Sequence, residues 1–177
     1  MAIRNQGFTL YELLITIVLI AIISSLAVPS LSGSIARQRQ RVEIDALFHA
    51  VHLARKESIM RRKVVSLCPS LDGQECSPSR DWSSGWLMFE NLDRDSPPQV
   101  DANEPVLLEH QVGENIRISA NRKGFTLRAT FLRATNGTFV FCDPEERISP
   151  RALVISYTGR PRVARHTSHG EPYSCAD

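Results

Sequence analysis

An apolar run near the start of the chain constrains the fold more than any other feature. From Phe8 to Val28 there are 21 residues, and Glu12 is the only charged one among them. About 20 apolar residues at the helical rise are enough to cross a bilayer core of roughly 30 Å. A carboxylate inside such a run is costly unless a partner neutralises it. Cleavage between Gly7 and Phe8 would supply that partner, because Phe8 would then carry a free α-amino group.

The residues around this run resemble those of one protein family. A short basic leader ends in Gly7, and Phe8-Thr9-Leu10-Tyr11-Glu12 follows, which is similar to the N-terminus of type IV pilins and type II secretion pseudopilins. In that family, prepilin peptidase cuts after the glycine and the new N-terminal Phe is methylated. The resemblance implies that Glu12 acts in filament assembly and that Pro29 is the helix-kinking proline. A plain membrane anchor is the alternative interpretation of the same run.

Patterning divides the chain into four parts. We expect a cleaved leader over residues 1–7, a transmembrane and filament-core helix over 8–28, an amphipathic continuation of that helix over 29–63, and a β-rich globular domain over 64–177. The length outside the leader and the apolar run is sufficient for one domain with a hydrophobic core. Apolar residues at helical spacing predict a single buried stripe on the continuation: Ile44, Leu47, Phe48, Val51 and Ala54.

After residue 63 the pattern becomes typical of strands. Short runs rich in β-branched and aromatic residues predict strands at 64–67, 85–89, 106–109, 116–119, 125–131, 138–141 and 152–157. The dipeptide Asn136-Gly137 predicts a hairpin between two of them. One long helix followed by antiparallel strands is an α+β arrangement. The resemblance implies a pilin fold, in which the hydrophobic half of the helix protrudes and the other half packs on an antiparallel sheet.

Charge is distributed unevenly along the chain, although the formal net charge is only +2. Residues 72–114 carry ten acidic and two basic side chains, so the basic residues concentrate on both sides of this segment. Within it, residues 91–104 hold several carboxylates and Pro97-Pro98, but the spacing is not that of an EF-hand. The segment is therefore predicted to be an exposed loop, and no metal site is assigned.

Four cysteines lie beyond the apolar run, at Cys68, Cys76, Cys142 and Cys175. In an exported protein an even number of cysteines indicates disulfides, and four cysteines allow three pairings. Proximity favours Cys68 with Cys76, and Cys142 with Cys175 would attach the C-terminal tail to the sheet. Zinc is the competing interpretation, but neither a C-x-x-C motif nor a suitably spaced His pair is present.

The globular part resembles one branch of the pilins. Cys68-Pro69-Ser70 with Cys76, then Gly85-Trp86-Leu87-Met88-Phe89, is similar to minor pilins of the FimT/FimU type and to the GspH pseudopilins of type II secretion. The later runs Gly137–Cys142 and Arg151–Ser156 extend this similarity. Trp82 and Trp86 are interpreted as core residues.

Three arginines lie within six residues in the stretch Gly159-Arg160-Pro161-Arg162-Val163-Ala164-Arg165. Gly and Pro predict a turn, which would project the guanidinium groups outward, and forked planar donors suit phosphate oxygens. Gly159-Arg160-Pro161-Arg162 resembles the Gly-Arg-Xaa-Arg element of FimT proteins that bind DNA in natural transformation. The resemblance implies that Arg160 and Arg162 are the principal DNA contacts. Charge alone adds Arg165 and Arg151.

The sequence thus predicts a minor pilin closest to the FimT type, a competence protein that binds extracellular double-stranded DNA. It would be anchored in the inner membrane by a single span with a periplasmic domain, and later stand at or near the tip of an extracellular pilus. Its partners would be other major and minor pilins, prepilin peptidase and DNA. The alternatives are a pilin that primes assembly without binding DNA, and a type II secretion pseudopilin. No catalytic motif and no cofactor are indicated.

Overall fold

The computed structural model describes residues 9–129 and 134–175, with the backbone alone for residues 26–30. Over these residues the chain forms one long helix, α1 (Leu10–Arg61), and then eight strands. The strands are β1 (Val65–Pro69), β2 (Gly85–Glu90), β3 (Val106–Gln111), β4 (Arg117–Ala120), β5 (Phe125–Leu127), β6 (Gly137–Cys142), β7 (Arg151–Ile155) and β8 (Pro161–Ala164). This order confirms the predicted α+β class. The chain divides into two compact units, residues 1–35 and 36–177.

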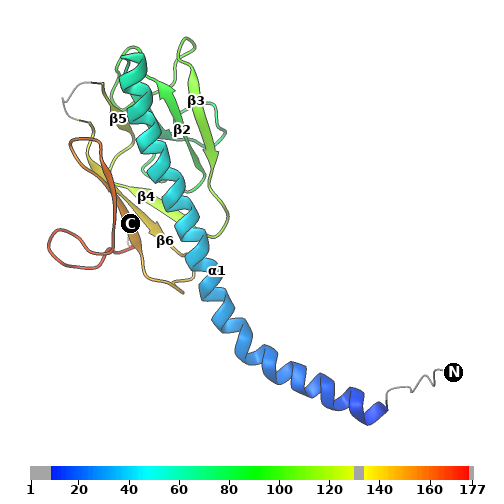
Figure 1. Ribbon diagram of the computed structural model, residues 1–177. Coiled ribbons are helices and arrows are strands. Elements are labelled where there is room, and N and C mark those ends of the chain that lie inside the picture. Colours follow the sequence, from blue (N-terminus) through cyan, green and yellow to red (C-terminus); the bar gives the residue numbers. More distant parts are fainter. Residues whose placement is uncertain (1–8, 130–133, 176–177) are drawn as a thin grey trace, which may run out of the picture. The chain divides into compact units, whose positions relative to one another are not determined.

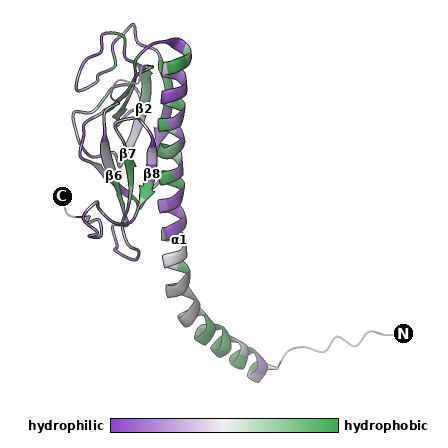
Figure 2. Cartoon of the chain, turned by 60° about the vertical axis from the view of Figure 1, so that its left-hand side comes forward, coloured by the Kyte–Doolittle hydropathy of each residue, from purple (hydrophilic) through white to green (hydrophobic). Residues whose placement is uncertain are grey.

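The first unit begins its helix with a capped turn. The Oγ1 of Thr9 accepts a hydrogen bond from the backbone N–H of Glu12 at 3.2 Å, and the Thr9 carbonyl accepts one from Leu13. This is the geometry of an N-cap, and an acidic residue in the first turn also suits the positive end of the helix dipole. The apolar side chains that follow, from Leu10 to Ile23, are exposed. Figure 2 shows this part of the helix as largely hydrophobic.

The helix is continuous through Pro29, whose backbone is helical. Within the residues searched, none of the helical stretches combines the length and the apolarity that crossing a membrane requires. The predicted span over 8–28 includes Phe8 and the side chains of residues 26–28, which lie outside the described set. The membrane-spanning helix therefore stays a prediction.

The second unit contains two antiparallel sheets and residues 36–61 of α1 (Figure 1). The first sheet has the strand order β3-β2-β1-β5, and the second has the order β4-β6-β7-β8. The edge strands of the first sheet are β3 and β5, and those of the second are β4 and β8. Where a single sheet was expected, the strands thus sort into two.

The core lies between the helix and the two sheets. Ile44, Leu47, Val51 and Ala54 are buried and Phe48 is partly buried, which confirms the predicted stripe. Both tryptophans are also confirmed as core residues: Trp82 has no exposed surface and Trp86 is 2% exposed. The side chains that meet the stripe come from both sheets, among them Val65, Leu67, Phe125, Phe139, Phe141, Leu153 and Ile155.

Two buried polar side chains fix the helix on the sheets. Gln40 donates both hydrogen bonds of its amide Nε2, one to the carbonyl of Phe141 at 3.0 Å and one to that of Ser149 at 3.1 Å. One turn further, Glu43 Oε2 lies 2.8 Å from Nε2 of His110, and Oε1 accepts from the N–H of Gly113. A buried polar group is tolerated only when it is paired, so these contacts fix how the helix lies on both sheets.

Both predicted disulfides are confirmed. Cys68 is bonded to Cys76 with a Cα–Cα distance of 5.5 Å, and Cys142 is bonded to Cys175 with a distance of 5.9 Å. The second bond joins the last residue of β6 to the C-terminal tail across 33 residues. The tail is thereby attached to the second sheet.

The hairpin predicted at Asn136-Gly137 is wrong. Strand β5 pairs with β1 in the first sheet, whereas β6 pairs with β4 and β7 in the second. The two strands contact each other through side chains instead, because the rings of Phe125 and Phe139 pack with their centroids 4.4 Å apart. A side chain at Gly137 would clash with the Phe125 ring, which explains why glycine is needed there. Part of the predicted strand 125–131 lies outside the described residues.

Candidate nucleic-acid interface

The arginine-rich stretch forms part of a β-hairpin: the predicted turn is present at Gly159 and Arg160, but strand β8 (Pro161–Ala164) follows it. The turn is confined to residues 156–160, where Gly159 has a φ of 70° and Ser156 accepts hydrogen bonds from Gly159 and Arg160. The chain then enters β8, which pairs with β7 in the register Ile155↔Pro161 and Val154↔Arg162. Pro161 is compatible with a strand here because β8 is the edge of the sheet.

The hairpin distributes the four candidate arginines over two sides of the sheet. Side chains alternate along a strand, and Pro161 shares the core side with its buried partner Ile155. Arg162 therefore projects from the opposite side, while Arg165 returns to the side that faces α1. Arg151 is on that same side, because it pairs with the buried Phe141. Arg160 stands exposed in the turn.

These four arginines have no carboxylate partner among residues 9–129 and 134–175. No ion pair or side-chain hydrogen bond joins Arg151, Arg160, Arg162 or Arg165 to another described group. Arg160, Arg162 and Arg165 are exposed, and Arg151 is half-buried. Their charge is therefore available to an external anion.

A fifth arginine lies beside the hairpin turn. A Cβ atom placed on Gly159 would be 3.4 Å from Nη1 of Arg55, so the guanidinium of this α1 residue is close to the turn that carries Arg160. The sequence analysis did not connect Arg55 with the arginine-rich stretch. No spacing in the sequence joins residue 55 to residue 159.

Arg151 and Arg165 open into a groove of about 420 Å³ on the α1 side of the second sheet. We call this the basic groove. Its charged and polar lining includes Arg37, Gln40, Arg147, Arg151, Arg165 and His166. These residues come from the helix, from the loop after β6, from β7 and from the end of β8, and the sequence analysis did not bring them together. The loop after β6 forms the rim of this groove. The only hint of it in the sequence was the spacing of Asp143 and Arg147, which are four residues apart and can form an ion pair.

That rim is held by a charged pair. Arg147 donates from Nε to Asp143 Oδ2 at 2.8 Å and from Nη2 to Oδ1 at 2.6 Å, and its Nη1 lies 3.1 Å from Glu145. The hydrogen bonds from Arg147 lower the pKa of the buried Asp143 against the opposing effect of burial. Arg147 is thus already neutralised, unlike Arg151 and Arg165.

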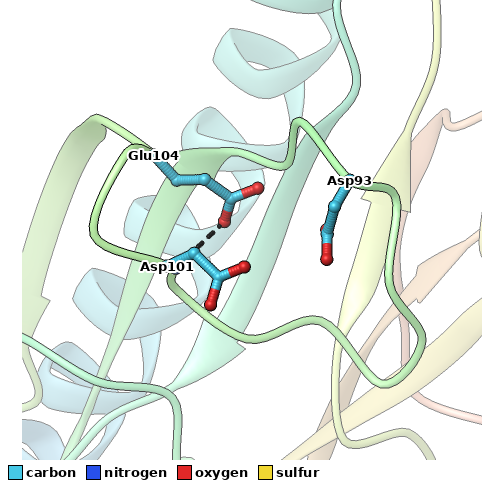
Figure 3. A group of neighbouring side chains, drawn as sticks. All are labelled: Asp93, Asp101 and Glu104. Carbon is cyan, nitrogen blue, oxygen red and sulfur yellow. Dashed lines mark hydrogen bonds between the residues drawn. The ribbon is translucent and has the colours of Figure 1, made fainter.

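The acidic segment forms an ordered loop between β2 and β3. Asp93, Asp101 and Glu104 bring one oxygen each within 4.8 Å of one another (Figure 3). Glu104 is buried, contrary to the prediction of a fully solvated loop, and its two oxygens accept hydrogen bonds from the backbone N–H groups of Leu92 and Asp101. Its carboxylate therefore joins the start of the loop, at Leu92, to its later part, at Asp101.

The predicted processing and assembly residues are only partly described. Gly7 and Phe8 lie outside the described residues. Glu12 is exposed, and no cation approaches its carboxylate within the described part of the chain. Pro29 is described by its backbone alone.

Comparison with known proteins gives two family matches. Residues 43–159 match the family described as type II transport protein GspH. Residues 3–28 match the prokaryotic N-terminal methylation motif. No curated protein sequence matches the chain.

Three solved structures share the fold. The type IV minor pilin FimU of Pseudomonas aeruginosa is 23% identical, with a TM-score of 0.55 over 77% of this chain and 99% of that one. GspH of E. coli is 14% identical (TM-score 0.52, 75% and 94% covered), and the minor pseudopilin EpsH of the Vibrio cholerae type 2 secretion system is 9% identical (0.51, 71% and 96%). The chain therefore belongs to the GspH/FimT/FimU family of type IV minor pilins and type II secretion pseudopilins, which are structural pilins rather than enzymes.

Proposed function

We propose that this protein is a minor pilin of a type IV pilus that binds extracellular double-stranded DNA for uptake in natural transformation. The observation that carries the proposal is the β7–β8 hairpin, an edge element that presents Arg160, Arg162 and Arg165 without any carboxylate partner among the described residues. Like charges gathered in one hairpin repel each other, and a bound anion would relieve that repulsion.

The chemistry of the hairpin suits a phosphate backbone. Guanidinium groups donate forked hydrogen bonds that match phosphate oxygens, and contacts to phosphates are independent of the base sequence. Arg160 in the turn and Arg162 in β8 are two residues apart, a span of up to about 7 Å, which allows them to reach different phosphates of one strand. Arg55 adds charge beside the turn.

The acidic loop does not oppose this binding mode. It precedes β3, the outer strand of the first sheet, whereas β8 is the outer strand of the second sheet. In Figure 1, β3 (green) and the β7–β8 hairpin (orange) lie on either side of α1. A duplex along β8 would therefore stay away from the carboxylates of the loop.

The N-terminal segment supplies the second half of the proposal. Prepilin peptidase would cut between Gly7 and Phe8, the new Phe8 would be methylated, and its α-amino group would neutralise Glu12 of the same or a neighbouring subunit. The match to the methylation motif supports this, as does the exposed Glu12, which has no cationic partner among residues 9–129 and 134–175. The chain would first be held in the inner membrane with its globular domain in the periplasm, and then enter the pilus near its tip.

One observation favours a second candidate. The exposed apolar side chains from Leu10 to Ile23 need other pilins to cover them, whatever the hairpin does. A pilin that primes assembly, or a pseudopilin of type II secretion, would use this surface and show no affinity for DNA.

A direct binding experiment separates the two. The full chain in neutral detergent is titrated into a short fluorescent duplex, and anisotropy is recorded. We compare it with the hairpin double variant, Arg160→Ala/Arg162→Ala, and with the helix control, Arg39→Ala/Arg41→Ala, which removes the same charge from exposed positions of α1. We expect the hairpin double variant to lose affinity by about tenfold or more and the helix control to change little. Equal losses in both variants would contradict a hairpin site, and absence of binding at low salt would leave the assembly pilin.

A further inference from the structure

Hydrogen bonds and an ion pair hold the walls of the basic groove in the second unit. One wall is fixed by Gln40, which is only 3% exposed and donates to the carbonyls of Phe141 and Ser149. The loop between them is fixed by the bidentate Asp143–Arg147 pair. A pre-formed wall lowers the entropic cost of binding, because only the side chains of Arg151 and Arg165 must be ordered when the ligand arrives.

Two arginines in this groove lie side by side on neighbouring strands, and no anionic side chain neutralises them among the described residues. Ala152 pairs with Ala164, so Arg151 and Arg165 occupy the next cross-strand position. Like charges directly opposite each other on neighbouring strands are destabilising. Neither guanidinium has an anionic partner in the described part of the chain, although Asp143 and Glu145 are engaged nearby by Arg147. An anion placed between Arg151 and Arg165 would turn this repulsion into attraction on both sides.

We propose that the basic groove binds a single phosphate group of a DNA strand, held between Arg151 and Arg165. This inference rests on the proposed function. It moves the main phosphate contact from the hairpin turn to the groove, which would hold the most tightly bound phosphate. The bound group is either an internal phosphodiester or the phosphomonoester at the end of a strand. A backbone that leaves the groove along the edge of β8 would meet Arg162 from the other side of the sheet and Arg160 at the turn.

Inorganic phosphate is the probe for the groove itself. The full chain in neutral detergent is titrated with sodium phosphate against a background of sodium chloride at constant ionic strength, and binding is followed by the shift in the thermal unfolding temperature. The groove double variant is Arg151→Ala/Arg165→Ala, and the hairpin double variant removes the same charge nearby. A third variant, Arg151→Lys/Arg165→Lys, keeps the charge and removes the forked donors.

We expect the groove double variant to bind phosphate about tenfold more weakly or not at all, the lysine variant to fall between it and the unmodified chain, and the hairpin double variant to be unchanged. The inference is overturned if phosphate stabilises the unmodified chain no more than chloride does. It is equally overturned if the groove and hairpin double variants lose phosphate binding to the same extent, because the effect would then be general charge.

Competition with oligonucleotides identifies the source of the phosphate. An oligothymidylate is added with and without a 5′-phosphate, and displacement of inorganic phosphate is measured. Preference for the phosphorylated oligonucleotide by about tenfold assigns a strand end to the groove, and equal competition assigns an internal phosphodiester. If neither competes, the groove is no DNA site and the inference fails. The proposed function fails separately, when the hairpin double variant still binds duplex DNA as the unmodified chain does.

Discussion

Gln40 of α1 donates a hydrogen bond from its side-chain Nε2 to the backbone carbonyl of Ser149 at 3.1 Å, across 109 residues of chain. The same nitrogen donates to Phe141. A single buried amide thus joins the helix to the strand that precedes the basic groove and to the loop that forms its rim. This contact links the packing of the helix to the shape of the candidate site.

Replacing Gln40 tests that link. We expect Gln40→Ala to lower the free energy of unfolding by about 1–3 kcal/mol, because two carbonyl groups lose their donor inside the protein. Gln38→Ala, at an exposed position two residues earlier, should change it by less than about 0.5 kcal/mol. Guanidinium unfolding followed by tryptophan fluorescence measures both, since Trp82 and Trp86 are buried in the core. Equal stability of the two variants would contradict a structural role for the amide.

The hairpin turn depends on a left-handed glycine. Gly159 has a φ of 70°, and a Cβ there would meet Leu127 Cδ2 at 2.9 Å. We expect Gly159→Ala to destabilise the protein by about 2 kcal/mol, from backbone strain and this clash together. Gly170→Ala is the matched control, because Gly170 has a φ of 83° but no atom within 4 Å of its Cβ position. Thermal unfolding of both should rank Gly159→Ala as clearly the less stable, and the reverse ranking would refute the close approach.

Stability should fall in acid because of Glu90. This carboxylate is 2% exposed and pairs with Lys63 at 2.6 Å and with Arg61 at 2.7 Å. The hydrogen bond from Lys63 is the main cause that lowers the pKa of Glu90 below its ordinary value of 4.5, with that from Arg61 adding to it against burial. A carboxyl with a lowered folded pKa contributes stability that is present above the unfolded pKa and is lost as pH falls through the folded one.

The measurement is the free energy of unfolding as a function of pH. We expect a decline below about pH 4.5 that is shallower in Glu90→Gln, which should also be about 1–2 kcal/mol less stable at pH 7. Glu114→Gln, at an exposed position, serves as the control. If Glu90→Gln followed the same pH profile as the unmodified chain, Glu90 would not be the group responsible. Other acidic groups, Asp143 among them, also contribute to the decline.

The two disulfides should differ in their effect on stability. Chain-entropy arguments give about 3.5–4 kcal/mol for the bond that closes 33 residues and about 2.5 kcal/mol for the bond that closes eight. We therefore expect Cys142→Ser/Cys175→Ser to lower the unfolding temperature more than Cys68→Ser/Cys76→Ser. Calorimetry of both double variants checks the order. A larger loss from the shorter loop would show that local packing around Cys68, not chain entropy, dominates.

Much of the fold could be predicted from the sequence, because the patterns that indicate it involve residues close together in the chain. The apolar stripe from Ile44 to Ala54 repeats within one helix, and both predicted disulfides are observed. The distribution of the strands between two sheets could not be predicted from the sequence. Asn136-Gly137 has the composition of a hairpin turn, yet β5 pairs with β1, some 60 residues earlier in the chain. Such long-range pairing leaves no trace in local composition.

Only part of the candidate site could be predicted from the sequence, for the same reason. Clustering in sequence identified Arg160, Arg162 and Arg165, but Gly159 and Pro161 suggested a turn where the structure forms an edge strand. The groove was missed because Arg37, Arg147 and Arg151 come together only in the folded domain. Charge alone did identify Arg151, without a geometric reason.

The salt dependence of DNA binding tests the central claim most directly. Each phosphate contact contributes about −0.9 to the slope of log K against log salt concentration. For the full chain in neutral detergent, between about 50 and 200 mM salt, we predict a linear decline that becomes shallower by about 1.8 in the hairpin double variant and stays unchanged in the helix control. If the hairpin double variant bound duplex DNA with the slope and affinity of the unmodified chain, the proposal that Arg160 and Arg162 contact DNA would be wrong.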